Sequence, residues 1–408
     1  MNLMEKLQKI LDQNKTDHNR SLNLENFFLK ELPDLSEYIW IEELFLDCNN
    51  IEKLNKEKFP PNLIELKIAR NRIDECNENC FPESLQILDI SNNKITLFDG
   101  SNFKNLEEID ISNNKIQKIE KFPESCKYIF VKNNELISLS GFNTMLLEFN
   151  CSNNKISEIS GINEKLIKLD ISNNIFTELP EMPSSLLVIN CSSCKIKTIT
   201  KIPKNLKKLI AYDNMINKID CELPLSLRIL DLSNNDLEEV PSLPNNLIKV
   251  DLSNNKILYI NEIPENLKEL DLTSNYLTDI PETILNNKNL TLKVENNKIE
   301  SKSDLESLFD NEDKFKPFGG EGNKLGSNNY FNYNKYNYTN HHNHAHNSLN
   351  NYYNSYGGSY HYGGTYNYNG NYNYANYNYG SNYSTTFTNN KAIKSNPNYI
   401  INKKHIVL

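Results

Sequence analysis

Two cysteines separated by two residues, Cys191 and Cys194, have the spacing of a zinc-binding or redox-active CxxC string. A structural zinc site needs four ligands, and the chain has no second CxxC string that would complete one. Cys76 and Cys80 are separated by three residues and do not match the motif. We interpret all four as small apolar side chains of a core, and we predict no metal site and no cofactor.

Five of the seven histidines lie between residues 341 and 361, and four of them form the cluster His341, His342, His344 and His346. Imidazole groups bind Ni²⁺, Cu²⁺ and Zn²⁺. His is one codon change from the abundant Asn and Tyr, and no fold is expected there to fix a ligand geometry, so metal binding by this cluster stays an open alternative. Residues 19–340 contain no His, which excludes a His general base or a His-dependent triad from that part.

Carboxylates recur at one fixed place before an Asn marker, in a column that Asn150 and Asn190 extend. The column comprises Asp89, Asp110, Asp170, Asp231, Asp251 and Asp271. On stacked strands about 4.8 Å apart, neighbouring carboxylates can bind Ca²⁺ or act as an acid–base pair. The surrounding sequence, Leu-Asp-Leu-Ser-Asn-Asn, nonetheless recurs with small variations in most copies of a repeat, which favours a structural role. Strings such as GxxxxGK[ST], HExxH and GxSxG are absent, and we predict no catalytic residue and no enzyme.

A repeat of 20 to 22 residues must position all these side chains. Segments 85–95 and 106–116 both read LxxLxLxxNxL. The second Asn of each copy, or the residue that replaces it, is Asn49, Asn71, Asn93, Asn114, Asn134, Asn154, Asn174, Cys194, Asn214, Asn235, Asn255, Asn275 or Asn297. An eroded first copy places Phe27 at this marker position.

The pattern resembles the leucine-rich repeat family over residues 20–300, and in particular the short Pro-containing subtype of secreted bacterial effectors. Segments 81–85 and 202–206 carry that subtype's Pro shortly before the strand. The resemblance implies a right-handed solenoid with a parallel sheet on its concave side and a ladder of buried marker Asn side chains. Strand-like alternation of apolar residues and the Pro residues of the return path predict the same arrangement, with an extended or 3₁₀ convex side and little helix.

Four segments follow from the composition. Residues 1–19 are predicted to form a capping helix, because Leu3, Met4, Leu7, Ile10 and Leu11 have helical spacing; a membrane-surface helix is the alternative. Residues 20–300 form the solenoid and 301–318 a C-terminal cap. Residues 319–408 form a disordered, low-complexity Asn/Tyr/Gly-rich tail that resembles tails of amoebal and giant-virus proteins.

The net charge differs between the repeat-containing part of the chain and the tail. Residues 319–408 contain six Lys, one Glu and no Arg, a balance of +5, so residues 1–318 carry −14 of the total −9. An acidic body argues against nucleic acid as the main ligand. No signal peptide and no apolar run of 18 residues is visible, so we expect no membrane association, a cytoplasmic location and reduced cysteines.

The functional prediction rests on the copies whose outward-facing residues differ from the usual ones of the repeat. Tyr128, Phe130 and Lys132 replace the default outward residues of one copy, and outward apolar and aromatic residues are typical of binding hot spots. The remaining departures are Phe45, Ile210 and Tyr212. We predict a non-enzymatic scaffold that binds a protein through its concave face, in an acidic field that favours a basic partner.

Two alternative functions stay open. In the first, the tail drives self-association or contacts RNA by stacking, with the repeats as a targeting module, although the tail lacks Arg-Gly repeats. Some bacterial relatives join such repeats to a ubiquitin-ligase domain with a catalytic Cys. Here no Cys follows Cys221, and the pattern predicts no folded domain after the repeats.

Overall fold

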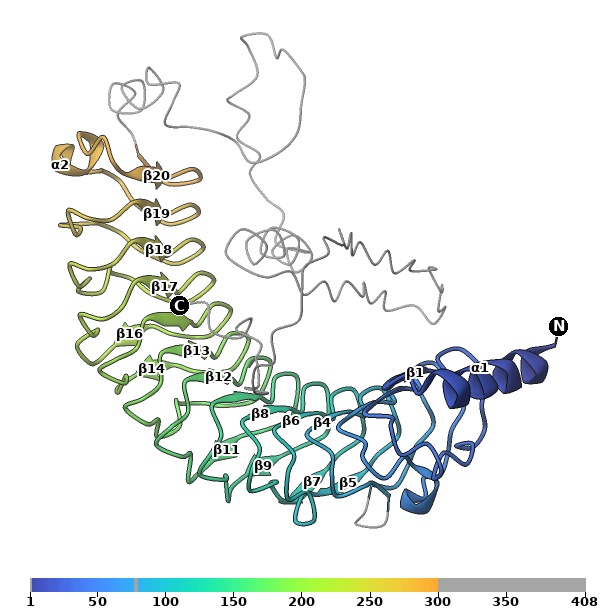
Figure 1. Ribbon diagram of the computed structural model, residues 1–408. Helices are drawn as coiled ribbons and strands as arrows, with labels where there is room; N and C mark the ends of the chain where they lie inside the picture. Colours follow the sequence, from blue (N-terminus) through green and yellow to red (C-terminus); the bar gives the residue numbers. More distant parts are fainter. Residues whose placement is uncertain (1, 77–79, 300–408) are drawn as a thin grey trace, which may run out of the picture. The chain divides into compact units, whose positions relative to one another are not determined.

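The computed structural model describes residues 2–76 and 80–299. They form a curved solenoid in which one 14-stranded parallel sheet lines the inner, concave side (Figure 1). The prediction of a leucine-rich-repeat-like solenoid with about fourteen strands and little helix is confirmed. The predicted C-terminal cap, the tail and its His cluster lie outside the described residues.

The sheet contains one strand from each coil, in the order of the sequence. Its strands are β1 (Ser21–Asn23), β2 (Glu43–Phe45), β3 (Glu65–Lys67), β4 (Ile87–Asp89), β6 (Glu108–Asp110), β8 (Tyr128–Phe130), β10 (Glu148–Asn150), β12 (Lys168–Asp170), β13 (Val188–Asn190), β15 (Lys208–Ile210), β17 (Ile229–Asp231), β18 (Lys249–Asp251), β19 (Glu269–Asp271) and β20 (Thr291–Lys293). All pairs are parallel and in the same register, so each repeat position forms a continuous column across the sheet.

Alternation along each strand separates the core from the concave surface. In β17 the central residue Leu230 is fully buried, as is Leu232 two residues later. The same holds for the corresponding apolar residues of the other coils, which stack into one continuous core. Because a single three-residue strand cannot bury its own apolar face, this stacking is what stabilises each coil.

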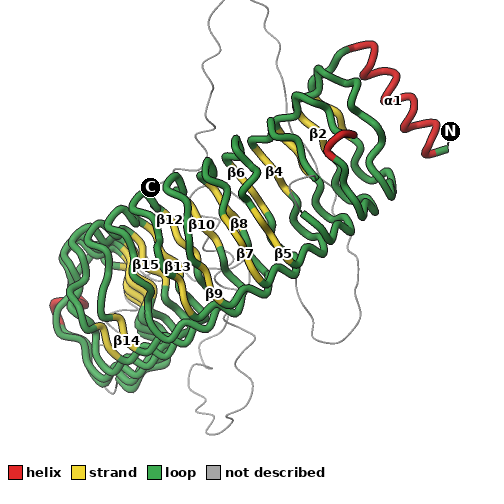
Figure 2. The backbone as a smooth tube through the Cα atoms, turned by 90° about the horizontal axis from the view of Figure 1, so that it is seen from below, coloured by secondary structure: helices red, strands yellow, loops and turns green. Residues whose placement is uncertain are grey.

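The convex side is mostly extended, with short strand pairs that the sequence did not predict (Figure 2). They are β5 (Leu97–Asp99) with β7 (Lys118–Lys121), β9 (Ser138–Leu139) with β11 (Glu158–Ile159), and β14 (Thr198–Ile199) with β16 (Lys218–Ile219). One 3₁₀ turn, η1 (Lys56–Lys58), and one short helix, α2 (Glu282–Leu285), complete the described part of this side.

Helix α1 (Leu3–Asp17) precedes the first strand. It begins at Asn2, whose side chain accepts from the Glu5 N–H while the Glu5 carboxylate accepts from the Asn2 N–H, a reciprocal cap. Leu7 and Leu11 join the core, whereas Leu3 and Met4 stay exposed. The helix is fixed to the first coils by Asn14, whose Oδ1 accepts from Trp40 Nε1 at 2.8 Å.

The marker Asn residues satisfy the backbone where each coil turns. In Asn174, Nδ2 donates to the carbonyl oxygens of Cys151, Ile171 and Ser172 at 2.9–3.1 Å, while Oδ1 accepts from the Ile156 N–H at 2.9 Å. The equivalent bonds recur from coil to coil and form a ladder. A carboxamide suits this place because it donates and accepts at once.

Replacing one ladder residue should destabilise the solenoid. Asn174→Ala leaves three buried carbonyls and one N–H without this partner, and we expect a loss of about 1–3 kcal/mol in the free energy of unfolding. The measurement is urea unfolding followed by circular dichroism. Cys194 supplies the control, because its sulfur only contacts the Ile171 and Ser192 carbonyls at 3.5 and 3.6 Å. Cys194→Ala should cost less, and equal losses would contradict the role of the carboxamide.

Candidate protein-binding surface on the concave face

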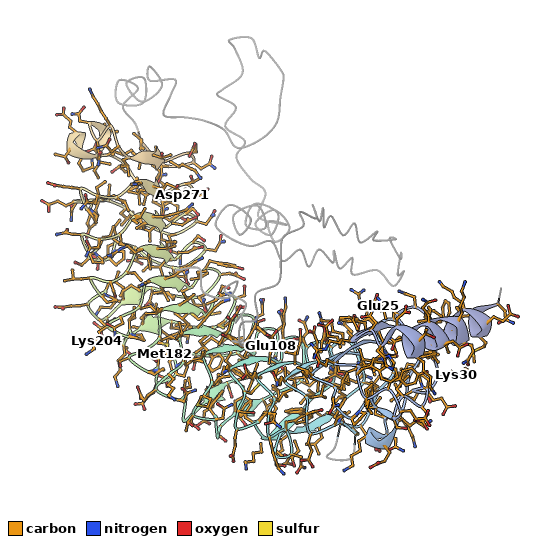
Figure 3. All side chains as sticks on the ribbon, in the orientation of Figure 1. Glu25, Lys30, Glu108, Met182, Lys204 and Asp271 are labelled. Carbon is orange, nitrogen blue, oxygen red and sulfur yellow. The ribbon has the colours of Figure 1, made fainter. Side chains whose placement is uncertain are left out.

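Each coil presents three side chains on the concave face. We call their positions the first, second and third columns; in one coil they are Tyr128, Phe130 and Lys132. The first and second columns are the two ends of each strand, and the third lies two residues beyond. Figure 3 shows Glu108 of the first column and Asp271 of the second on this inner side, while Lys204 lies on the outer side.

The carboxylates of the second column have a structural role. In β17, Asp231 Oδ1 accepts from the Ser233 N–H at 3.1 Å and from Ser233 Oγ at 2.8 Å, which closes the turn after the strand. Asn190 makes the same two bonds to Ser192 at 3.2 and 2.7 Å. Because Asn serves as well as Asp, the turn does not require a charge. This supports the interpretation that the column belongs to the usual sequence of the repeat and has a structural role.

These carboxylates are more deeply buried than their outward direction implies. Asp231 is only 8% exposed. Burial raises the pKa of Asp231 to about 7 and that of Asp110 to about 6. The adjacent second-column carboxylates, Asp251 beside Asp231 and Asp89 beside Asp110, raise both further, while the serine bonds oppose the shift. Asp110 and Asp231 therefore titrate well above the usual range of an aspartate.

Tyr128 and Phe130 form an aromatic pair on β8. Tyr128 lies between Glu108 and Glu148 of the neighbouring strands, and both rings are half-buried. Burial raises the pKa of the Tyr128 hydroxyl, so it stays neutral. An apolar surface ringed by carboxylates can bind a side chain that is both flat and cationic, as arginine is.

Ile210 and Tyr212 form a second group, four strands from the first. Tyr212 is half-buried and burial raises its pKa, whereas Ile210 is only 6% exposed. Ile210 therefore offers a partner little area, and Tyr212 is the more accessible of the two. Beside them lies Lys208, a half-buried lysine whose pKa burial lowers.

Phe45 stands apart from both groups. It lies four strands from Phe130 on the other side, and the Lys67 ammonium sits over its ring at 5.3 Å. The structure thus brings Tyr128, Phe130 and Lys132 together on one coil and Ile210 with Tyr212 on another, and leaves Phe45 alone. Lys208 and its neighbours Val188 and Ile229 were not predicted as part of this surface, although their shared position in the repeat aligns them in the first column.

The cysteines occupy core positions. Cys191 is fully buried and Cys194 is 9% exposed, and burial raises the pKa of both thiols. Within residues 2–76 and 80–299, no group of three or more His, Cys, Asp or Glu side chains is arranged to hold a metal ion. No helix in that part of the chain is long and apolar enough to cross a membrane.

Comparison with known proteins agrees with the repeat pattern. The family described as "Leucine Rich repeats (2 copies)" matches residues 83–124, and "Leucine Rich Repeat" matches residues 226–247 and 266–287. No curated protein sequence matches the chain.

Solved structures share the architecture. YopM, a leucine-rich effector protein from Yersinia pestis, is 28% identical with a TM-score of 0.62, over 71% of this chain and 81% of YopM. A leucine-rich repeat protein of Leptospira interrogans is 24% identical with a TM-score of 0.60, over 71% of this chain and 81% of that one. A chain of the LRIM1/APL1C complex is 22% identical with a TM-score of 0.55, over 63% of this chain and 52% of that one. The last two show the fold alone. With its repeat motif, its Asn ladder and these similarities, the chain is a leucine-rich repeat solenoid that resembles the bacterial effectors of that family.

Proposed function

We propose that the protein is a non-enzymatic scaffold that binds another protein through its concave face. The observation that supports this most is the replacement of the default Asp and Ser of one coil by Phe130 and Lys132, with Tyr128 beside them. Two half-buried rings at a surface lined elsewhere mostly by Asp, Asn, Ser, Glu and Lys gain by being covered, and aromatic anchors dominate protein interfaces.

The partner's contact region is expected to be basic. Glu108 and Glu148 flank Tyr128, and Asp110 flanks Phe130. An Arg side chain of the partner can stack on the rings and pair with Glu108 or Asp110, and Glu148 pairs with Lys168 at 2.6 Å within the chain. Steering by the acidic field would raise the association rate and make it dependent on salt.

Solved relatives support protein binding as a use of this fold. YopM is a leucine-rich effector protein, and the LRIM1/APL1C structure is that of a complex. Neither identifies a partner for this chain, since one fold serves many partners. We further propose a reducing compartment such as the cytoplasm, because six of the eight cysteines are buried thiols within the repeats.

The experiment is capture of partners from an extract of the native source with the full-length chain as bait. A parallel bait carries Tyr128→Ser and Phe130→Asp. A protein that binds the first bait directly and not the second supports the concave surface. If deletion of residues 319–408 abolishes every association while the double change has no effect, the tail-driven alternative is correct instead.

A further inference from the structure

At the N-terminal ends of the strands, the residue that precedes each strand lies beside its counterparts in the neighbouring coils. Five consecutive members of this row are Leu147, Ile167, Leu187, Lys207 and Arg228. Each backbone N–H from Ile167 onward donates to the carbonyl of the preceding member at 2.8–2.9 Å, so the five lie side by side. All are half-buried. We call this set the edge row.

The edge row has an apolar end and a basic end. Met145, two residues before the first member, is 38% exposed and extends the apolar end. At the other end Lys204 occupies the turn before Lys207, and in the described part of the chain neither lysine forms an ion pair. Arg228 is held in place by donating to the carbonyls of Leu225, Ser226 and Leu227 at 3.1 Å.

The basic end is an exception in an acidic body. Residues 182–212 contain six lysines and no Asp or Glu, whereas residues 1–318 as a whole carry −14. Within the row the basic side chains follow directly on three aliphatic ones. A partner that matches both ends must carry apolar anchors followed by carboxylates.

We propose that the edge row binds an acidic amphipathic helix of another protein, independently of the concave surface. Strands stack about 4.8 Å apart and a helix rises about 5.4 Å per turn, so successive helical turns meet successive coils. Four gaps span roughly 19 Å, which corresponds to about 13 helical residues. The partner helix places aliphatic or aromatic residues over Leu147, Ile167 and Leu187 and carboxylates over Lys207 and Arg228.

Nucleic acid fits this surface less well. Its phosphates would match the lysines, but the edge row offers no aromatic ring for base stacking, and its three aliphatic side chains would face a polyanion. The same position continues beyond the five members as Lys127 beside Leu147 and as Ile248 beside Arg228. Lys127 is paired with Glu107 at 2.9 Å, so an acidic helix about as long as the row meets, among the described residues, its unpaired lysine at Lys207.

The test selects ligands without assuming a natural partner. A phage-displayed library of random 16-residue peptides is panned on the full-length chain, and enriched peptides are measured by fluorescence anisotropy. We expect enriched sequences with apolar residues three or four apart at one end and Asp or Glu at the other. Lys204→Glu with Lys207→Glu should weaken their binding at least tenfold, and Ile167→Ser should also weaken it.

The matched control is Lys94→Glu with Lys115→Glu, which makes the same charge change at exposed positions beyond the other end of the strands. It should leave binding within twofold, as should Tyr128→Ser with Phe130→Asp, so failure here is distinct from failure of the concave surface. Thermal unfolding confirms that each variant is folded. The proposal is overturned if no such peptide is enriched, if the control weakens binding equally, or if a single-stranded oligonucleotide binds the edge row more tightly than the peptide.

Discussion

At pH 8 the variant Asp231→Asn is expected to be more stable than the wild-type protein. The carboxylate of Asp231 is nearly buried and lies beside Asp251 of the neighbouring strand, and Lys208 is the cationic group that lowers its pKa. Keeping it ionised costs free energy that a neutral carboxamide does not. The turn survives the change, because Asn190 makes the same bonds to its serine two coils away.

The sign of the pH dependence follows from the two protonation states. The pKa of Asp231 is about 7 when folded and about 3.9 when unfolded, so between these values the folded protein binds more protons. Stability from this group is therefore greatest below pH 4 and falls as pH rises to 7. The full difference amounts to at most about 4 kcal/mol.

Urea unfolding at pH 5 and pH 8 measures the effect. The variant should gain up to about 4 kcal/mol at pH 8, and less at pH 5. The free energy of unfolding of the variant should still depend on pH, because burial also raises the pKa of Asp110, Asp170 and Asp251. The reverse change Asn190→Asp, which sets a carboxylate beside Asp170, should destabilise the protein at pH 8. A less stable Asp231→Asn variant would mean that Lys208 compensates the charge.

The columns and the ladder were predictable because the repeat occurs so often. Thirteen copies reveal which positions must be apolar and which must be Asn, and parallel stacking converts each position into a column. The bonds of Asn174 are those that the turn requires, whichever side chains surround them.

The depth of the concave side chains was not predictable in the same way. Alternation gives the direction of Asp231 and Ile210, and both do lie on the concave face. Their exposure depends on side chains of neighbouring coils, 20 residues away in sequence, and these cover both to below 10%. Ile210 therefore offers a partner little contact area, and its role as an anchor stays a prediction. The edge row was missed for a related reason, since each of its members is ordinary by itself and only adjacency makes a surface.

Binding should depend most strongly on the aromatic pair. Tyr128→Ser with Phe130→Asp is expected to weaken binding of a captured partner by at least about thirtyfold, which corresponds to about 2 kcal/mol. The rings supply the apolar contact at the centre of the acidic surface, and the new carboxylate at residue 130 would repel no basic partner. The loss therefore reports the missing rings rather than charge repulsion.

Stability should change little, since neither ring belongs to the core that Ile129 and Val131 form on the other side of the same strand. The matched control is Asp251→Asn, which removes a concave charge six coils away while keeping a side chain that closes the turn. It should change the affinity only slightly, mainly through a slower, salt-dependent association rate. Surface plasmon resonance at two salt concentrations separates the two effects. If the double variant is folded and binds with wild-type affinity, the concave aromatic pair is not the anchor, because no other residue of that coil could replace two lost rings.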